Sequence, residues 1–139
     1  MTRGRCLCGG IVFEIDGRLA PIQICYCKQC QRAQGTALAT NIPVPESDFR
    51  ILAGAALLAS YESSPGKLRC FCSRCGSPIL SKRSEVPGVV RVRAGTLDEP
   101  IATRPGIHVH TATKPSWWDI HDDLPQCESG ELPKRGNPT

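Results

Sequence analysis

The sequence predicts a mostly β fold with little helix, and three observations support this prediction. The 139 residues include 13 glycines and 12 prolines, which divide the chain by frequent turns and disfavour long helices. Several short segments between these turns alternate apolar and polar residues, which is the period of a strand. The nine cysteines occur mostly in close-spaced groups, as in small domains that a metal ion stabilises.

The expected strands follow from local alternation. In the first, at residues 10–15, Ile11, Phe13 and Ile15 share one face, while Val12 and Glu14 share the other. Alternation or a short apolar run between turn residues predicts the remaining strands. In chain order, these strands are expected at residues 22–25, 49–52, 57–61, 67–71, 89–93 and 107–110.

One helical turn is expected, at residues 28–34, directly after a cysteine group. The length suits one domain, which we place at residues 1–128. The polar stretch SGELPKRGNPT, residues 129–139, is expected to be a flexible tail. The organisation predicted is therefore a single domain with a short C-terminal extension.

The charge and hydropathy patterns bear on partners and location. The net charge is +4, which suits an anionic small substrate. The 17 Lys and Arg are spread along the chain and do not form the basic stripe with interleaved aromatics that is typical of nucleic-acid binding. The N-terminus MTRGRCLCGGIVFEI has no apolar signal-peptide core. The longest apolar run, residues 51–59, is far shorter than the roughly 20 residues that span a bilayer. We therefore expect no membrane association and a cytoplasmic location, where thiols stay reduced.

The cysteines favour metal binding over disulfides. Their number is odd, and they repeat the spacings C-x-C and C-x-x-C, which are typical of metal sites. Zinc is the expected metal because it is redox-inert and prefers tetrahedral thiolate ligands; an iron–sulfur cluster is the alternative. The cysteines are Cys6, Cys8, Cys25, Cys27, Cys30, Cys70, Cys72, Cys75 and Cys127.

The spacing leaves the division of the cysteines open, because CFCSRC at residues 70–75 repeats the pattern of CYCKQC at residues 25–30. The glycines help: CLCGG at residues 6–10 and CSRCG at residues 72–76 both place glycine after a cysteine, where a positive-φ turn can aim backbone N–H groups at sulfur. The most economical arrangement is one complete four-thiolate zinc site made of Cys6, Cys8, Cys72 and Cys75.

Three cysteines, Cys25, Cys27 and Cys30, then remain together without a fourth thiolate close in sequence. A zinc ion with three protein ligands and one exchangeable position is the arrangement of catalytic sites, whereas four protein ligands indicate a structural site. The side chains that could supply a fourth ligand instead are Cys70, Cys127, His108, His110 and His121.

Further motifs follow the cysteine groups in a definite order. They are GRCLCGGIVF (residues 4–13), CYCKQC (25–30) with Gly35 and Thr36 after it, RCFCSRCGS (69–77), AGTLD (94–98), PGIHV (105–109), KPSW (114–117) and DLP (123–125). Through these motifs the sequence resembles the glutathione-dependent formaldehyde-activating enzyme family, which also includes centromere protein V. Tyr26 departs from the pattern, since many relatives have histidine at that position.

The resemblance implies a fold, two zinc ions and a reaction. The fold is Mss4-like, a zinc-binding fold of antiparallel sheets. One zinc is structural, on Cys6, Cys8, Cys72 and Cys75, and the other is catalytic, on Cys25, Cys27 and Cys30. The reaction is that of a carbon–sulfur lyase acting on a thiol–aldehyde adduct, with glutathione and formaldehyde as the pair that the family name suggests. A zinc-stabilised module that binds nucleic acid or protein without catalysis is the alternative.

Nearby side chains could assist the reaction. Lys28, Arg32 and Arg69 lie close in sequence to the cysteines and could hold the carboxylates of glutathione, although exposure to solvent alone would also explain them. His108 falls in a motif of the family and is expected near the site. The adjacent Trp117 and Trp118 are expected to pack in the core or at its edge.

Overall fold

The computed structural model describes residues 1–130. The chain forms two compact units: one holds Met1–Ala20 and Ile42–Ala102, and the other holds Pro21–Asn41 and the described residues from Thr103 onward. The single domain at residues 1–128 stays a prediction. Most of the tail predicted at 129–139 lies outside the described residues. Within the described range, no helix combines the length and the apolar character that a membrane crossing requires.

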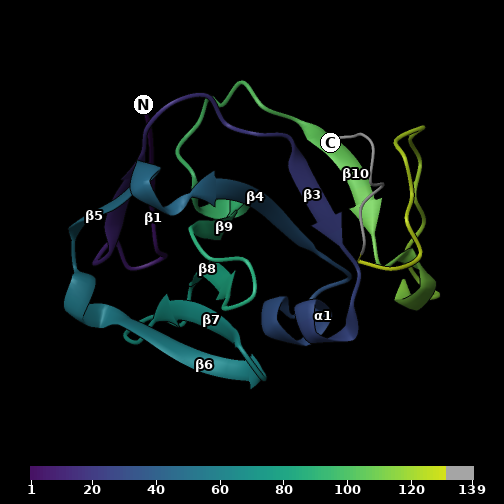
Figure 1. Cartoon of the computed structure of the whole chain (residues 1–139), viewed down its shortest axis with the longest axis horizontal. Coiled ribbons are helices and arrows are strands. Elements are labelled where there is room, and N and C mark those ends of the chain that lie inside the picture. Colours follow the sequence, from purple (N-terminus) through teal and green to yellow (C-terminus); the bar gives the residue numbers. More distant parts are fainter. Residues whose placement is uncertain (131–139) are drawn as a thin grey trace. The chain divides into compact units, whose positions relative to one another are not determined.

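Strands make up most of the regular secondary structure of the described chain (Figure 1), which confirms the mostly β prediction. The first unit contains β1 (Thr2–Arg5), β2 (Val12–Ile15), β5 (Phe49–Ala53), β6 (Leu58–Ser64), β7 (Lys67–Cys72), β8 (Pro78–Arg83) and β9 (Val89–Arg93), with short 3-10 turns η1 (Glu46–Asp48), η2 (Ala55–Leu57) and η3 (Ala94–Thr96). The second unit contains β3 (Ile22–Cys25), α1 (Lys28–Gln34), β10 (Pro105–Val109) and η4 (Thr111–Thr113). Strand β4 (Ala39–Pro45) begins in the second unit and ends in the first.

Two sets of strands organise the first unit. Strands β1, β2 and β5 form an antiparallel sheet in that order, and β6, β7, β8 and β9 pair antiparallel with their sequence neighbours. The alternation predicted for residues 10–15 holds on the inner face, because Ile11, just before β2, and Phe13 and Ile15 within it are fully buried. Glu14, expected on the outer face, is also buried, and its carboxylate pairs with Arg50 and with Arg3.

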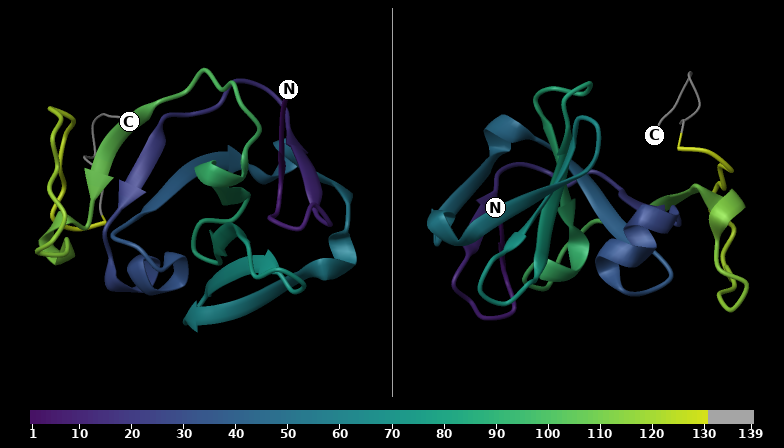
Figure 2. Two further views of the ribbon diagram at one scale, coloured as in Figure 1. Left: turned by 180° about the vertical axis from the view of Figure 1, so that it is seen from behind. Right: turned by 90° about the horizontal axis from the view of Figure 1, so that it is seen from below.

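In the second unit, β3 pairs antiparallel with the start of β4 and parallel with β10. The two views in Figure 2 show β3 and β10 side by side. The parallel β3–β10 pair makes this sheet mixed, beside the antiparallel pairing that the resemblance implied. A parallel partner needs a long connection, and here the whole chain between Cys25 and Pro105 provides it.

Local sequence patterns predicted some of the strands and the helix correctly but missed other strands. Strands β3 and β9 and helix α1 have the predicted bounds, whereas β1, β4 and β8 were not predicted. Strand β1 has no apolar alternation, and β4 and β8 contain prolines, which argue against strands in a sequence. These strands form because neighbours supply hydrogen bonds, as β2 does along all of β1.

Gly54 should be intolerant of any side chain. Its φ is +81°, and a Cβ there would lie 2.0 Å from the Gly10 carbonyl oxygen. We expect Gly54→Ala to lower the free energy of unfolding by more than about 3 kcal/mol, since the clash adds to the strain of a positive φ. Gly17→Ala is the matched control, because its φ is +80° but its nearest neighbour, Asp48, is 4.0 Å away. Urea unfolding measures both; equal losses for the two variants would contradict the argument.

Candidate metal centres

Four cysteines of the first unit meet at one point. The Sγ atoms of Cys6, Cys8, Cys72 and Cys75 all lie within 4.8 Å of one another. The Sγ of Cys8 is 3.6 Å from that of Cys6 and 3.9 Å from that of Cys72. Thiolates bound at 2.3 Å to a tetrahedral zinc are separated by roughly 3.8 Å, so this set matches the geometry of a four-thiolate zinc site.

Two tight turns position these sulfurs, as the glycines predicted. The Gly9 N–H donates to the Cys6 carbonyl at 3.0 Å, and the Gly76 N–H donates to the Cys72 carbonyl at 2.7 Å. Both glycines have positive φ, +77° and +79°. The Ile11 N–H donates to Cys6 Sγ at 3.2 Å, so backbone dipoles face the sulfur cluster.

Arg74 adds a positive charge at the edge of the same cluster. Its Nε donates to Cys8 Sγ at 3.4 Å. This hydrogen bond, helped by the Gly10 backbone, lowers the pKa of the exposed Cys8 thiol to about 6. A thiol that is largely ionised at neutral pH is ready to bind a cation.

The second unit holds a cluster of three cysteines, Cys25, Cys27 and Cys30, whose Sγ atoms also lie within 4.8 Å of one another. Cys25 ends β3, Cys27 is the N-cap of α1, and Cys30 lies in the first turn of that helix. The Cys30 N–H donates to Cys27 Sγ at 3.3 Å, and the sulfurs of Cys30 and Cys25 are 3.4 Å apart. The strand end and the capped helix thus bring the three thiols together without any residue from elsewhere in the chain.

Burial is uneven around this cluster. Cys25 and Cys30 are buried, and Cys27 is partly exposed. Ile107 and Val109 of β10 pack against the buried pair. The pKa of the Cys25 thiol is raised far above its usual value, because it shares hydrogen bonds with Cys27 and Cys30 and is buried. A bound cation would stabilise the Cys25 thiolate and so remove this obstacle to its ionisation.

No fourth side chain completes the second cluster among residues 1–130: no further Cys, His, Asp or Glu offers a ligand atom within 4.8 Å of all three sulfurs. Cys127 packs against the same apolar cluster but does not join the sulfur group. His108 is committed elsewhere, since both of its ring nitrogens have hydrogen-bond partners. The exposed His121 also stays outside the group.

A chain of polar side chains runs from the buried Tyr26 and His108 to the exposed Asp122. The Tyr26 hydroxyl is 2.9 Å from His108 Nδ1, and His108 Nε2 is 3.0 Å from Asp122 Oδ1. Burial raises the pKa of Tyr26, and the Leu124 N–H, followed by His108, lowers the pKa of Asp122.

The backbone of Tyr26 is held as firmly as its side chain. Its carbonyl accepts hydrogen bonds from Gln31 Nε2 at 2.8 Å and from Thr113 Oγ1 at 2.9 Å. Its N–H donates to the Val109 carbonyl at 3.1 Å. These hydrogen bonds hold the backbone of Tyr26 in place and so help to position its neighbours Cys25 and Cys27.

The seven cysteines lie in the two groups that the spacing predicted, and three other side chains that the sequence singled out lie as follows. Arg69 is buried on β7, where its Nε donates to Ser63, so it is not a solvated side chain. Trp117 and Trp118 are 67% and 38% exposed and do not lie in the core. The polar chain through Asp122 was missed, because nothing in a sequence shows that residues 26, 108 and 122 meet.

Removing the Tyr26 hydroxyl should be costly. We expect Tyr26→Phe to lower the free energy of unfolding by about 1–3 kcal/mol, because His108 Nδ1 would lose its partner in a buried position. Tyr61→Phe is the control: Tyr61 is 67% exposed, and its loss should stay within about 0.5 kcal/mol. Chemical denaturation of both variants checks this. A Tyr26→Phe protein as stable as Tyr61→Phe would show that the polar chain contributes nothing.

Comparisons with known proteins identify a family and relatives of this chain. Residues 1–113 match the family described as glutathione-dependent formaldehyde-activating enzyme. A Halomonas elongata protein, provisionally named a glutathione-dependent formaldehyde-activating enzyme, is 29% identical over 140 residues, covering 94% of this chain and 88% of its own.

A solved structure supports the fold. The crystal structure of a Rhodobacter sphaeroides protein has a TM-score of 0.61 and 24% identity, and the alignment covers 73% of this chain and 97% of that one. The family match extends over most of the chain and includes both cysteine clusters. The chain therefore belongs to the glutathione-dependent formaldehyde-activating enzyme family.

Proposed function

We propose that this protein is a zinc-dependent carbon–sulfur lyase that joins glutathione to formaldehyde, giving S-hydroxymethylglutathione, and catalyses the reverse reaction. The observation that carries the proposal is the cluster of Cys25, Cys27 and Cys30, which offers a metal three sulfurs and, among residues 1–130, no fourth protein ligand. The complete cluster of Cys6, Cys8, Cys72 and Cys75 would hold a second, structural zinc.

The donor set of the second cluster suits zinc. Three thiolates are soft ligands, and the separation of 3.4 Å between the sulfurs of Cys25 and Cys30 is close to the roughly 3.8 Å expected around a tetrahedral ion. When bound there, zinc would lower the pKa of a fourth, external thiol and so supply a thiolate at neutral pH.

The reaction itself needs little more than that thiolate. The sulfur lone pair of glutathione forms a bond to the carbonyl carbon of formaldehyde, and the C=O π electrons move to oxygen. The thiol proton passes to solvent, and the oxygen takes a proton from solvent. In the reverse direction the carbon–sulfur bond breaks and the C=O bond forms again, so neither an oxidant nor a reductant is needed.

The protein side chains would orient the thiol and limit access. The Cys30 N–H donates to Cys27 Sγ and stabilises negative charge on it. Ile107 and Val109 cover the buried side of the cluster, so an external thiol would approach beside the partly exposed Cys27. Lys28 and the exposed Arg32 follow on α1 and would offer positive charge to the carboxylates of glutathione.

Exchange NMR tests the proposal. Glutathione and formaldehyde are mixed until the adduct is at equilibrium, and the rate of exchange between free and adducted glutathione is measured with and without the zinc-loaded protein. We expect faster exchange with the protein. An exchange rate equal to that in buffer, with both clusters metal-loaded, would contradict this substrate pair and favour a non-catalytic binding module.

We also propose a cytoplasmic location. The two proposed zinc sites require seven reduced cysteine thiols, and a reducing compartment such as the cytoplasm keeps thiols reduced.

A further inference from the structure

Asp122 reaches the buried His108 from the surface of the second unit. The Asp122 side chain is 45% exposed, whereas the His108 side chain is 3% exposed. Both oxygens of the carboxylate face the same ring nitrogen, since Oδ1 lies 3.0 Å and Oδ2 lies 3.1 Å from His108 Nε2. The Leu124 N–H donates to Oδ1 at 3.0 Å, so the carboxylate is oriented by its own segment. His108 therefore has an acceptor in a fixed place.

The charge of Asp122 determines where the hydrogens of this polar chain lie. The Leu124 N–H, followed by His108, lowers the pKa of Asp122, so at neutral pH the side chain is a carboxylate and only accepts hydrogen bonds. His108 Nε2 must then carry a hydrogen. In the neutral imidazole Nδ1 is left as an acceptor, and the Tyr26 hydroxyl donates to it across 2.9 Å. The Trp118 side chain, whose indole N–H can only donate, also hydrogen-bonds Tyr26.

The polar chain ends at the residue between two of the cysteines. Tyr26 is 1% exposed, and its neighbours Cys25 and Cys27 supply two of the three sulfurs of the second cluster. A rotation of the Tyr26 backbone would move these two sulfurs relative to each other. Metal–ligand distances tolerate deviations of only about 0.2 Å, so the hydrogen bonds that hold Tyr26 affect how well the cluster fits a metal ion.

The segment that carries Asp122 also holds the strand beside Tyr26. The His108 N–H donates to the Pro125 carbonyl at 2.9 Å, and the Cys127 N–H donates to the His108 carbonyl at 2.8 Å. Tyr26 in turn donates its N–H to the carbonyl of the residue after His108, at 3.1 Å. Asp122 therefore lies at the start of a segment that is already attached to β10, and its carboxylate needs little further ordering to hold His108.

We propose that Asp122 is a positioning residue for the metal site of the three-cysteine cluster, and that it acts through His108 and Tyr26. The inference rests on the proposed function in that this cluster binds zinc. Groups that orient metal ligands from outside the coordination sphere change metal affinity or activity by roughly 10–100-fold. Asp122 does not belong to the sulfur group and acts through two other side chains, so we expect an effect of about tenfold.

Zinc binding to Asp122→Asn tests the proposal. The variant keeps the shape of the side chain but replaces an acceptor-only group by an amide, which can accept or donate and so imposes neither tautomer on His108. Competition with a zinc chelator is followed on the ¹⁵N-labelled full chain, with the Cys30 amide reporting the three-cysteine cluster and the Gly76 amide reporting the four-cysteine cluster. We expect zinc to bind the three-cysteine cluster about tenfold more weakly, and the four-cysteine cluster as in the wild type.

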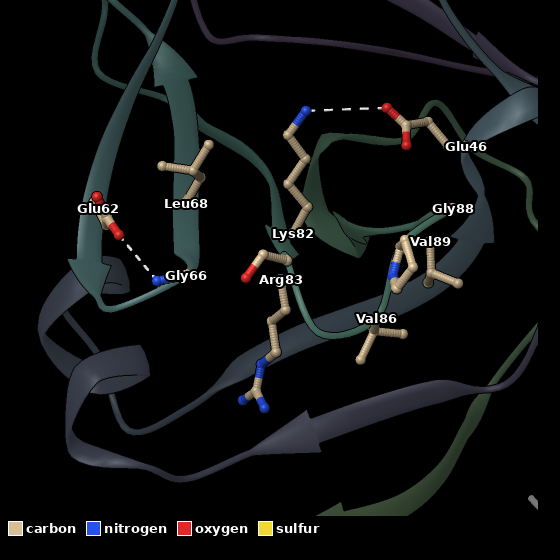
Figure 3. A pocket seen from close by; sticks show the side chains of 11 residues that line it. Glu46, Glu62, Gly66, Leu68, Lys82, Arg83, Val86, Gly88 and Val89 are labelled. Carbon is tan, nitrogen blue, oxygen red and sulfur yellow. Dashed lines mark hydrogen bonds and ion pairs between the residues drawn. The ribbon is translucent and has the colours of Figure 1, made fainter.

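Two control variants remove a carboxylate elsewhere. Asp123→Asn makes the same change at the adjacent, exposed position. Glu46→Gln removes the acid that lies 3.9 Å from Lys82 Nζ in a pocket of the first unit, which Figure 3 shows. Both variants should bind zinc at the three-cysteine cluster as the wild type does. Equal zinc affinities of Asp122→Asn and Asp123→Asn would overturn the proposal.

A double-mutant cycle shows whether Asp122 acts through Tyr26. Tyr26→Phe removes the hydroxyl that meets His108, so adding Asp122→Asn to it should weaken zinc binding no further. A further tenfold loss in the double variant would overturn the proposal. Long-range ¹H–¹⁵N NMR of the wild type depends on no variant: the His108 ring should carry its hydrogen on Nε2, and a hydrogen on Nδ1 alone would also overturn the proposal.

The zinc measurement needs neither glutathione nor formaldehyde. A protein that fails to accelerate their exchange would therefore leave this test unaffected, and an unchanged zinc affinity of Asp122→Asn would leave the lyase proposal standing. A three-cysteine cluster that takes up no zinc would overturn both.

Discussion

Replacing Cys72 by serine is expected to abolish cooperative folding. Cys72 is fully buried, and its sulfur belongs to the four-thiolate cluster that ties the N-terminal turn at Cys6 to the end of β7. Structural zinc sites contribute of the order of 10 kcal/mol, which exceeds the net stability of many small domains. Thermal unfolding followed by circular dichroism, with zinc content measured in parallel, checks this expectation.

Cys70→Ala provides the control for Cys72→Ser. Cys70 lies on the same strand and is also buried, but it belongs to neither cluster. Its replacement should cost only about 1–2 kcal/mol and should retain all bound zinc. If Cys72→Ser were as stable as Cys70→Ala, the first cluster would not be the metal site that holds this unit together.

Replacing Cys27 by serine is expected to leave the protein folded but to remove its acceleration of the glutathione–formaldehyde exchange completely. Serine is a good N-cap, so its hydroxyl can still accept the Cys30 N–H that now bonds to Cys27 Sγ. Two thiolates would remain, which is too few to retain zinc firmly. Metal analysis should show the loss of one ion of the two, and circular dichroism should show an unchanged fold.

Cys127→Ser is the matched control for Cys27→Ser. Like Cys27, Cys127 packs against the apolar cluster that contains Cys25, Cys30 and Ile107. Its sulfur does not belong to the group formed by Cys25, Cys27 and Cys30. The variant should keep both ions and the full exchange rate. Loss of an ion or of activity in Cys127→Ser would mean that Cys127 closes the fourth position, and the site would then be structural.

The sequence was most informative where chemistry is local. Cys25, Cys27 and Cys30 lie within six positions, so a strand end and one helical turn suffice to gather them. The glycines after Cys8 and Cys75 marked positive-φ turns for the same reason. Helix α1 and strand β3 had the predicted bounds because each is delimited by local signals.

Long-range pairing was not predictable in this way. Strand β8 begins with Pro78 and includes Ser81 and Lys82, and it exists because β7 and β9 flank it. The chain of Tyr26, His108 and Asp122 depends on β10 lying parallel to β3, which no residue pattern specifies. Glu14 is buried, although its polarity predicted a solvent-exposed face. It can be buried there because Arg3 and Arg50 pair with its carboxylate and neutralise its charge.

Cadmium-113 NMR of the protein loaded with cadmium at both clusters tests the open fourth position most directly, because the cadmium chemical shift reports the number of bound sulfurs. On addition of glutathione, we expect the resonance of the Cys25, Cys27 and Cys30 site to move towards that of the four-thiolate site, while the latter does not change. Two resonances that already match four sulfurs and stay unmoved by glutathione would contradict the account.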